Sequence, residues 1–209
     1  MRRVAVVAVA LVTATAAVAQ QPADKTPVVR YGVTSNATFY PQGTAKEALA
    51  SAAKAMENRR HEYVVAHIMD PAVVDGLVAE RARRLEPEVE KELATRRADQ
   101  RRNPAVTAAE LLPVNPSEFA ERVKAEAEKR AFQSVVQSVR DNLGESPENV
   151  RLLAKFAREG TIAENGAAAT VTLPDVKGKQ VYLKQAGNRW HVEDRQTEDF
   201  KPKADKAEK

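Results

Sequence analysis

The spacing of the hydrophobic residues changes at Gly160, and this change constrains the fold more than any other feature of the sequence. Before Gly160, apolar residues recur every three or four positions, most regularly between 119 and 143. After Gly160 they recur at every second position. The first spacing is typical of one face of a helix and the second of one face of a strand. We therefore predict an α+β protein, mostly helical, in which helices pack on a C-terminal antiparallel β-meander.

The meander is predicted to contain four strands, because turn sequences that contain glycine fall near 165–166, 177–178 and 187–188. The predicted strands are 161–164, 167–173, 179–185 and 189–195. Trp190, the single tryptophan, falls on the apolar face of the last strand. Since such a face must be covered, we expect Trp190 to be buried beneath a helix predicted over 45–58.

The first helices have recognisable starts and ends. Thr44 and Glu47 match a capping box, in which each side chain satisfies a free amide group at the start of the helix 45–58. A second helix is predicted over 60–69. Asp70 stands before a proline, where it ends the second helix and caps the next one.

A long charged region, 72–145, is predicted to be a helical insertion in a domain that spans 44–196. Between 80 and 102, eight basic and six acidic residues surround a thin row of apolar residues. This pattern is typical of a solvated helix that lies along a surface or forms one arm of a hairpin. Pro87 lacks a backbone donor, so we expect it to break or kink this helix.

The N-terminus resembles a secretory signal peptide. Arg2 and Arg3 supply positive charge, an apolar run follows over 4–18, and Ala-Val-Ala at 17–19 matches a cleavage site. The apolar run is shorter than the roughly 20 residues that span a bilayer. We therefore expect 1–19 to be removed and the protein to be exported, either to the periplasm or out of the cell.

The segments that flank the domain carry little periodicity. An extended lead-in is predicted over 20–43, with an edge strand within 28–33, and a disordered charged tail over 197–209. No second apolar run reaches membrane-spanning length, so we expect no transmembrane segment in the mature chain.

Composition excludes several classes of function. The chain has no cysteine, which rules out disulfides, thiolate metal ligands and thiol catalysis. Without Arg2 and Arg3, 31 of the 33 basic residues remain against 29 acidic residues, a net charge of +2. So small an excess does not indicate a nucleic-acid partner. The sequence contains no nucleotide-binding or other cofactor motif, so we expect the protein to bind no cofactor.

Three sequence features together resemble the cystatin-like, nuclear-transport-factor-like superfamily, in particular its small secreted bacterial members. They are a capped, alanine-rich helix after Pro-Gln-Gly at 41–43, a helix that ends in Ile-Met-Asp-Pro at 68–71, and the closing Val-Tyr-Leu-Lys-x-x-Gly-Asn-Arg-Trp at 181–190. The resemblance implies that 44–71 lie as helices across a sheet formed by 161–196. The family includes isomerases, dehydratases and ligand carriers, so the resemblance implies no single function.

Enzymes of this family use Tyr, Asp and His side chains inside an apolar pocket. Tyr63, His67 and Asp70 lie about one helical turn apart, and with Trp190 they form a candidate pocket. The alternative interpretation is structural: Asp70 caps a helix, and Tyr63 and Trp190 are core aromatic residues.

The histidines do not indicate a metal site. His61 and His67 are six residues apart, which places them on different faces of a helix, and His191 lies on a distant strand. We expect each to be a surface histidine or a core histidine with satisfied hydrogen bonds, and we expect no bound metal.

Four arginines form the one local excess of charge: Arg96, Arg97, Arg101 and Arg102. They are candidates for contact with an anionic surface, such as lipid headgroups, a cell-wall polymer or an envelope protein. The alternative is the basic end of a solvated helix, where cations complement the helix dipole.

Three functions remain open on the sequence alone. The first is an exported, non-enzymatic binding or interaction domain. The second is an enzyme or small-ligand carrier with an apolar pocket, and the third is a holdase-type chaperone that binds unfolded chains on its helical arm. An enclosed cavity of several hundred Å³ between sheet and helices would favour the second of these.

Overall fold

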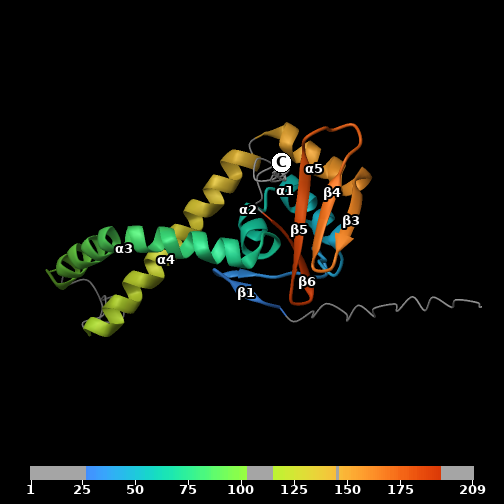
Figure 1. Ribbon diagram of the computed structural model, residues 1–209. Helices are drawn as coiled ribbons and strands as arrows, with labels where there is room; N and C mark the ends of the chain where they lie inside the picture. Colours follow the sequence, from blue (N-terminus) through green and yellow to red (C-terminus); the bar gives the residue numbers. More distant parts are fainter. Residues whose placement is uncertain (1–26, 103–114, 145, 194–209) are drawn as a thin grey trace, which may run out of the picture.

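The computed structural model describes residues 27–102, 115–144 and 146–193. A body built from a sheet and short helices carries a projecting arm of two long helices (Figure 1). The predicted signal peptide, 1–19, and the predicted tail, 197–209, lie outside the described residues.

The predicted meander is confirmed as a four-stranded antiparallel sheet in the order β3-β4-β5-β6. Its strands are β3 (Thr161–Asn165), β4 (Ala168–Thr172), β5 (Gln180–Ala186) and β6 (Arg189–Val192). Two helices contribute to the same core as the apolar face of this sheet, α1 (Ala45–Glu57) and α5 (Pro147–Glu159). The α+β class predicted from the change of spacing is therefore correct.

The core between the sheet and these helices forms around Trp190, which is 3% exposed. It packs in one cluster with Leu49 of α1 and Leu183 of β5, so its predicted position beneath the first helix is confirmed. Gly160 joins α5 to β3 where the chain passes close to the sheet. A Cβ atom there would collide with the carbonyl of Phe156 and the side chain of Val171, so the glycine is required by close approach.

The helix starts follow the predicted caps. The Thr44 hydroxyl accepts the backbone N–H of Glu47 at 3.1 Å, and the Glu47 carboxylate accepts that of Thr44 at 3.1 Å, which confirms the capping box. The predicted second helix differs in detail. It consists of one α turn, α2 (His61–Tyr63), followed by a π-helical turn, η1 (Val64–Ile68).

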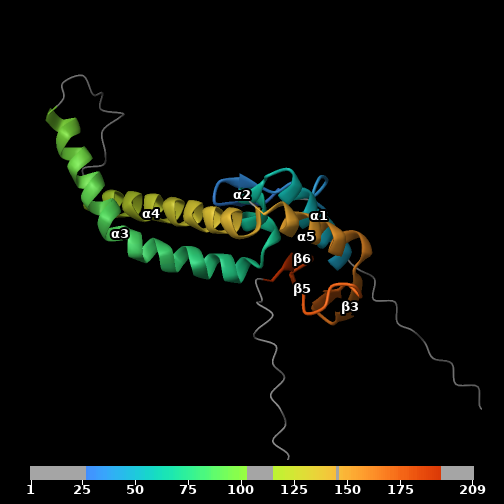
Figure 2. The same cartoon turned by 90° about the horizontal axis from the view of Figure 1, so that it is seen from above.

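The arm consists of α3 (Pro71–Arg102) and α4 (Pro116–Val139), followed by a π turn, η2 (Arg140–Gly144). The two helices lie side by side in antiparallel directions and extend well beyond the body (Figure 2). Pro87 lies inside α3, so the helix is not broken there, although α3 changes direction along its length in the same view.

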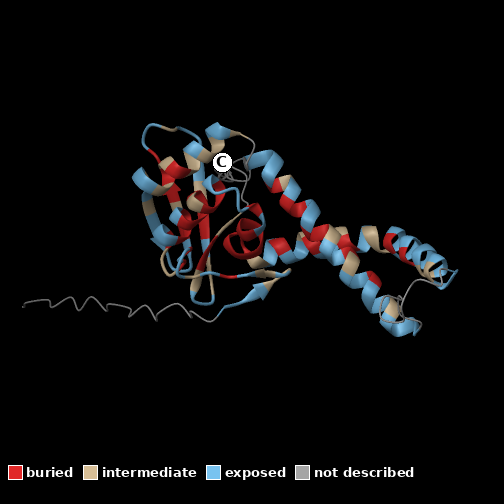
Figure 3. Ribbon diagram, turned by 180° about the vertical axis from the view of Figure 1, so that it is seen from behind, coloured by how far each residue is buried: buried red, intermediate tan, exposed pale blue. Residues whose placement is uncertain are grey.

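A row of buried residues joins the two helices of the arm and continues into the body (Figure 3). On α3 the row consists of Val74, Val78, Ala82, Val89 and Leu93, and on α4 of Val123, Ala127, Ala131, Phe132, Val135, Val136 and Val139. The arm is thus joined to helices of the body, and only the meander core forms a separate cluster. Within the described residues, no helix has both the length and the apolar character to cross a membrane.

The N-terminal segment forms a separate hairpin instead of the expected edge strand within 28–33. Its strands are β1 (Val29–Arg30) and β2 (Val33–Thr34), and they pair only with each other. The turn between them places Tyr31 and Gly32 at φ values of 52° and 79°. The Tyr31 ring stacks on Phe132 of α4 with centroids 4.7 Å apart, and its hydroxyl donates to Asp75 of α3 at 2.6 Å. The hairpin therefore holds the root of the arm.

Candidate functional site

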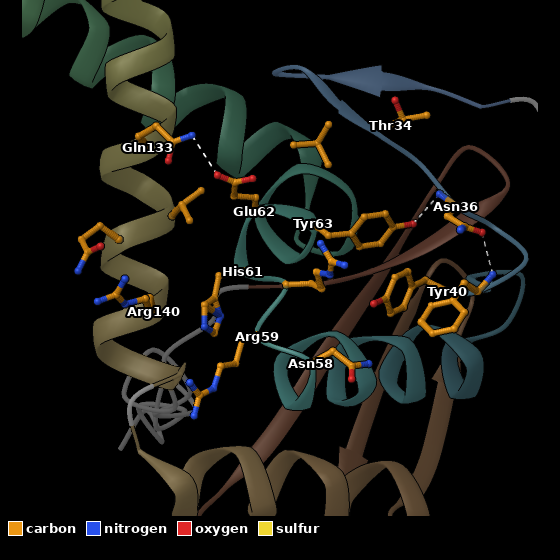
Figure 4. Close-up of a pocket in the computed structure, with 15 residues that line it drawn as sticks. Thr34, Asn36, Tyr40, Asn58, Arg59, His61, Glu62, Tyr63, Gln133 and Arg140 are labelled. Atoms are coloured by element: carbon orange, nitrogen blue, oxygen red, sulfur yellow. Dashed lines mark hydrogen bonds between the residues drawn. The ribbon is translucent and has the colours of Figure 1, made fainter.

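A cleft of about 840 Å³ lies where the arm joins the body. Three segments that are distant in sequence line it: 33–40 after the hairpin, 58–63 between α1 and η1, and 133–140 at the end of α4 (Figure 4). Polar and charged side chains on its walls are exposed, among them Arg59, Glu62 and Gln137. The cleft is therefore accessible from solvent.

One wall of the cleft is aromatic. The rings of Tyr40 and Tyr63 lie 4.4 Å apart, and Phe39 meets Tyr40 edge-on at 4.8 Å. The Tyr63 hydroxyl oxygen accepts the backbone N–H of Asn36 at 3.0 Å. Burial raises the pKa of Tyr63, so its hydroxyl keeps its proton at neutral pH and can donate to a ligand. Phe39 remains 47% exposed, with the Lys54 ammonium 3.3 Å from its ring centroid.

The opposite end of the cleft is cationic because of its arginines, and we call Arg59, Arg60 and Arg140, together with the ring of His61 beside them, the cationic corner. Arg59, His61 and Arg140 lie close together on this side in Figure 4. The nearest acidic side chain on the cleft wall, Glu62, accepts a hydrogen bond from Gln133 at 3.2 Å. Positive charge therefore exceeds negative charge at this end.

Arg59 occupies this corner in a strained backbone conformation. The amide of Arg59 donates to Met56 and the amide of Arg60 donates to Ala55, the paired hydrogen bonds that close a Schellman motif at the end of α1. Arg59 has φ of 55°, at the position where such motifs usually have glycine. The motif turns the chain sharply and projects the two arginines into the cleft.

His61 is buried beside these arginines and is 8% exposed. Its Nδ1 atom is buried and has no hydrogen-bond partner within the part of the chain that the structure describes. Burial, and then the charge of Arg140, lower the pKa of His61. The ring is therefore neutral at pH 7, and the hydrogen-bonding capacity of Nδ1 is unused among the described residues.

Of the four predicted pocket residues, Tyr63 lines this cleft, and His67, Asp70 and Trp190 do not. Trp190 belongs to the core against the sheet. His67 is 3% exposed, and its Nε2 lies 2.8 Å from the carbonyl oxygen of Val33. Asp70 has the structural role considered above: it accepts the backbone N–H of Ala72 at 3.0 Å at the start of α3.

The histidines are all buried, so the surface interpretation of them is wrong. His191 is 6% exposed, and its Nδ1 also has no partner among the described side chains and backbone. Burial lowers the pKa of His191 to about 4, although the charge of Asp70 acts in the opposite direction. Over the described ranges, no group of three or more acidic or histidine side chains has a geometry that could hold a metal ion.

The four predicted surface arginines lie near the far end of α3, away from the cleft. Arg96, Arg101 and Arg102 are exposed, whereas the guanidinium of Arg97 lies over the Phe119 ring, 5.2 Å from its centroid. Arg101 and Arg102 fall in the last turn of the helix, where cations complement its dipole.

A second, apolar cavity lies between the helices and the edge of the sheet, where the resemblance implies a pocket. Its volume is about 120 Å³, and its lining includes Met56, Ile68, Leu153 and Val192. It is much smaller than the several hundred Å³ that small-ligand sites occupy.

The cationic corner was not predicted from the sequence. Its residues come from two helix ends that are distant along the chain, and no motif joins them. One local signal was available, since the helix 45–58 ends in Asn-Arg-Arg where a glycine is usual.

Comparisons of the chain with family models, with curated proteins and with solved structures found no match.

Proposed function

We propose that this protein is an exported, non-enzymatic binding domain whose ligand site is the cleft at the root of the arm. The observation that carries the proposal is the wall chemistry of the cleft. An aromatic wall of Phe39, Tyr40 and Tyr63 faces a cationic end with Arg59 and Arg60. An apolar platform with a few convergent polar groups is the usual composition of a small-ligand site.

The alternative of a pocket enzyme or carrier has less support. The apolar cavity of about 120 Å³ is too small for most metabolites, and Asp70 is engaged as a helix cap. In the cleft, His61 lies near arginines, and no hydroxyl or carboxylate of the described residues forms a hydrogen bond with it. A general base requires a partner of this kind to be positioned for catalysis.

The holdase alternative also has less support. Binding unfolded chains requires exposed apolar surface. The large hydrophobic residues that are exposed within the described ranges are Val28, Val29, Phe39, Val73 and Leu143. None of them lies on the outer part of the arm, where charged residues predominate.

The export part of the proposal is supported by the sequence of residues 1–19. An exported protein would meet envelope proteins, lipid headgroups and cell-wall polymers, and we propose the ligand is part of one of these. Mass spectrometry of the exported protein is expected to find its N-terminus at or near Gln20. A mature form that retains residues 1–19 would contradict export with cleavage.

The cleft proposal is tested by obstructing the cleft without altering the fold. Gln137 and Lys129 are both exposed on α4, but only Gln137 lines the cleft. Ligand-observed NMR should screen acetylated amino acids and their amides, sugars, sugar acids and glycerol phosphates. We expect at least one class to bind the parent and Lys129→Trp but not Gln137→Trp. Binding that persists in Gln137→Trp, or a panel with no binder, would refute the cleft as the ligand site.

A further inference from the structure

We propose that the cationic corner is an oxyanion subsite, which binds a carboxylate or phosphate group of the ligand while the rest of the ligand lies on the aromatic wall. This inference rests on the proposed function, because the subsite is one end of the same cleft. Three independent features of the corner support it among the described residues: the unpaired side chains of Arg59 and Arg60, the strained backbone of Arg59, and the unpartnered Nδ1 of His61.

The first feature is the state of the arginines. Arg59 and Arg60 are exposed, and neither has an ion pair or side-chain hydrogen bond with any other residue in the described ranges. Most other arginines at the root of the arm are engaged, as Arg30 is with Asp75 at 2.5 Å. Arg140 adds its charge from the start of η2, directly after α4, and already interacts within the molecule. Guanidinium groups pair with carboxylates and phosphates through two parallel hydrogen bonds, so Arg59 and Arg60 are suited to an oxyanion.

The second feature is the position of Arg59. A residue other than glycine at φ of 55° carries a steric penalty from its Cβ atom, and the Schellman motif at the end of α1 would be more stable with glycine. Local strain of this kind clusters at functional sites. Tyr31 has a similar φ of 52°, but of these two residues Arg59 is the one whose side chain lines the cleft. We therefore explain the presence of arginine instead of glycine at this position by the binding of a ligand oxyanion to the arginine side chain.

The third feature is His61, more than nine-tenths buried, with Nδ1 unpartnered among the described residues. A buried polar atom without a partner is costly, so it marks a place where a ligand atom completes the hydrogen bonding. The neutral ring lines the cleft beside Arg59 and Arg140, and an imidazole can donate one hydrogen bond to an oxyanion. Glu62 lies next to His61 and offsets part of the positive charge, and its carboxylate accepts a hydrogen bond from Gln133 of α4.

The shared chemistry of the ligand is thus an oxyanion next to an apolar or aromatic group. A carboxylate would come from a polypeptide end or a sugar acid, and a phosphate from a lipid headgroup. Two matched pairs of probes separate these sources. N-acetylphenylalanine and its amide test the carboxylate, and phenyl phosphate and phenol test the phosphate.

The test measures the affinity of each probe by NMR titration of the parent, of Arg59→Gly, Arg60→Gln and Arg140→Gln, and of the control Arg151→Gln. Arg151 is exposed on α5 and is not part of the cleft lining. We expect the anionic member of at least one pair to bind the parent about tenfold more tightly than its neutral partner, because a charge-assisted hydrogen bond is worth roughly this factor. The three corner variants should lose this preference, and the control should keep it.

Arg59→Gly gives a second readout that separates binding from folding. We expect its melting temperature to rise, because glycine removes the strain, while its preference for the anionic probe is lost. If neutral and anionic probes bind the parent equally, or if Arg59→Gly keeps the full preference, the oxyanion subsite is refuted. Equal binding that Gln137→Trp abolishes would refute the subsite and leave the cleft proposal in place. If neither anionic probe binds at millimolar concentration, the subsite is also refuted.

Discussion

The two hydrophobic cores of this protein are built differently, although one helix contributes to both. The core of the sheet gathers Trp190, Leu183 and Phe156 from strands and a helix that are distant in sequence. The core of the arm is a single row along two helices that continues into η1. Helix α1 contributes Leu49 to the first core and Met56 to the second.

This difference indicates where each core is vulnerable. A side chain in the sheet core is enclosed by strands on one side and helices on the other, so its loss affects the whole body. A buried side chain of the arm is enclosed mainly by the facing helix. Its truncation is therefore expected to destabilise only the neighbouring turns of α3 and α4. Because the row narrows with distance from the body, we expect stability to decrease toward the far end of the arm.

The largest expected effect is in the sheet core. Trp190→Ala should lower the free energy of unfolding by about 3 to 5 kcal/mol, because it empties the centre of a closed cluster. Urea denaturation followed by circular dichroism measures the change. A loss below 1 kcal/mol would show that the sheet is not covered as described.

The next effect is a dependence on pH that arises from the histidines, all three of which lie in the body. The pKa of His191 is about 4 in the folded protein, below its ordinary value of 6.5, so the unfolded chain binds more protons between these values. The contribution of the neutral His191 to the free energy of unfolding is therefore full above pH 6.5, and it is lost as the pH falls from 6.5 through about 4. By linkage, the free energy of unfolding that depends on His191 in this way is about 3 kcal/mol.

Urea denaturation at pH values between 7 and 4 measures this loss. The lowered pKa values of His61 and His67 add to it in the same direction. His191→Gln should reduce the slope. An unchanged slope in this variant would place the acid sensitivity elsewhere.

The arm should respond locally to a cavity of similar chemistry. Leu93→Ala removes a buried side chain near the far end of α3 and should cost about 2 kcal/mol. Hydrogen exchange should accelerate in the outer turns of α3 and α4, while exchange in β4 and β5 stays unchanged. Faster exchange throughout the sheet would mean that the two cores unfold together.

The smallest effect is expected at the junction of the two regions. Asp70 caps α3 and lies 3.2 Å from the Lys184 ammonium of β5. Asp70→Ala should cost about 0.5 to 2 kcal/mol through loss of the cap. Asp70→Asn keeps an amide oxygen for capping, so it should cost less, and thermal melts of the two variants check this order. Equal costs would assign the effect to the charge of Asp70.

Much of the fold was predictable because its signals are local. The capping box at Thr44, the cap at Asp70 and the strands after Gly160 follow from the residue and its near neighbours. The hairpin at 29–34 was missed because its turn has Tyr31 where glycine or asparagine is usual. The π turn η1 was missed because its apolar spacing over four or five residues matches an ordinary helix.

The candidate site was less predictable for a physical reason. The cleft exists only because the end of α4 lies beside α2, which follows the end of α1, and this contact depends on the path of the whole arm. His67 and Asp70 were selected for spacing on one helix, but backbone hydrogen bonds occupy both. The resemblance to the cystatin-like superfamily stays a prediction.

The arm can also be considered as a lever whose fulcrum is the N-terminal hairpin. At 1.5 Å per residue, the 32 residues of α3 extend up to about 48 Å, so a rotation of about 10° at the root would displace the far end by about 8 Å. The cleft lies next to the fulcrum, and one of its walls is the inner end of α4. A rotation of the arm about the hairpin would therefore change the width of the cleft and the position of the far arginines together.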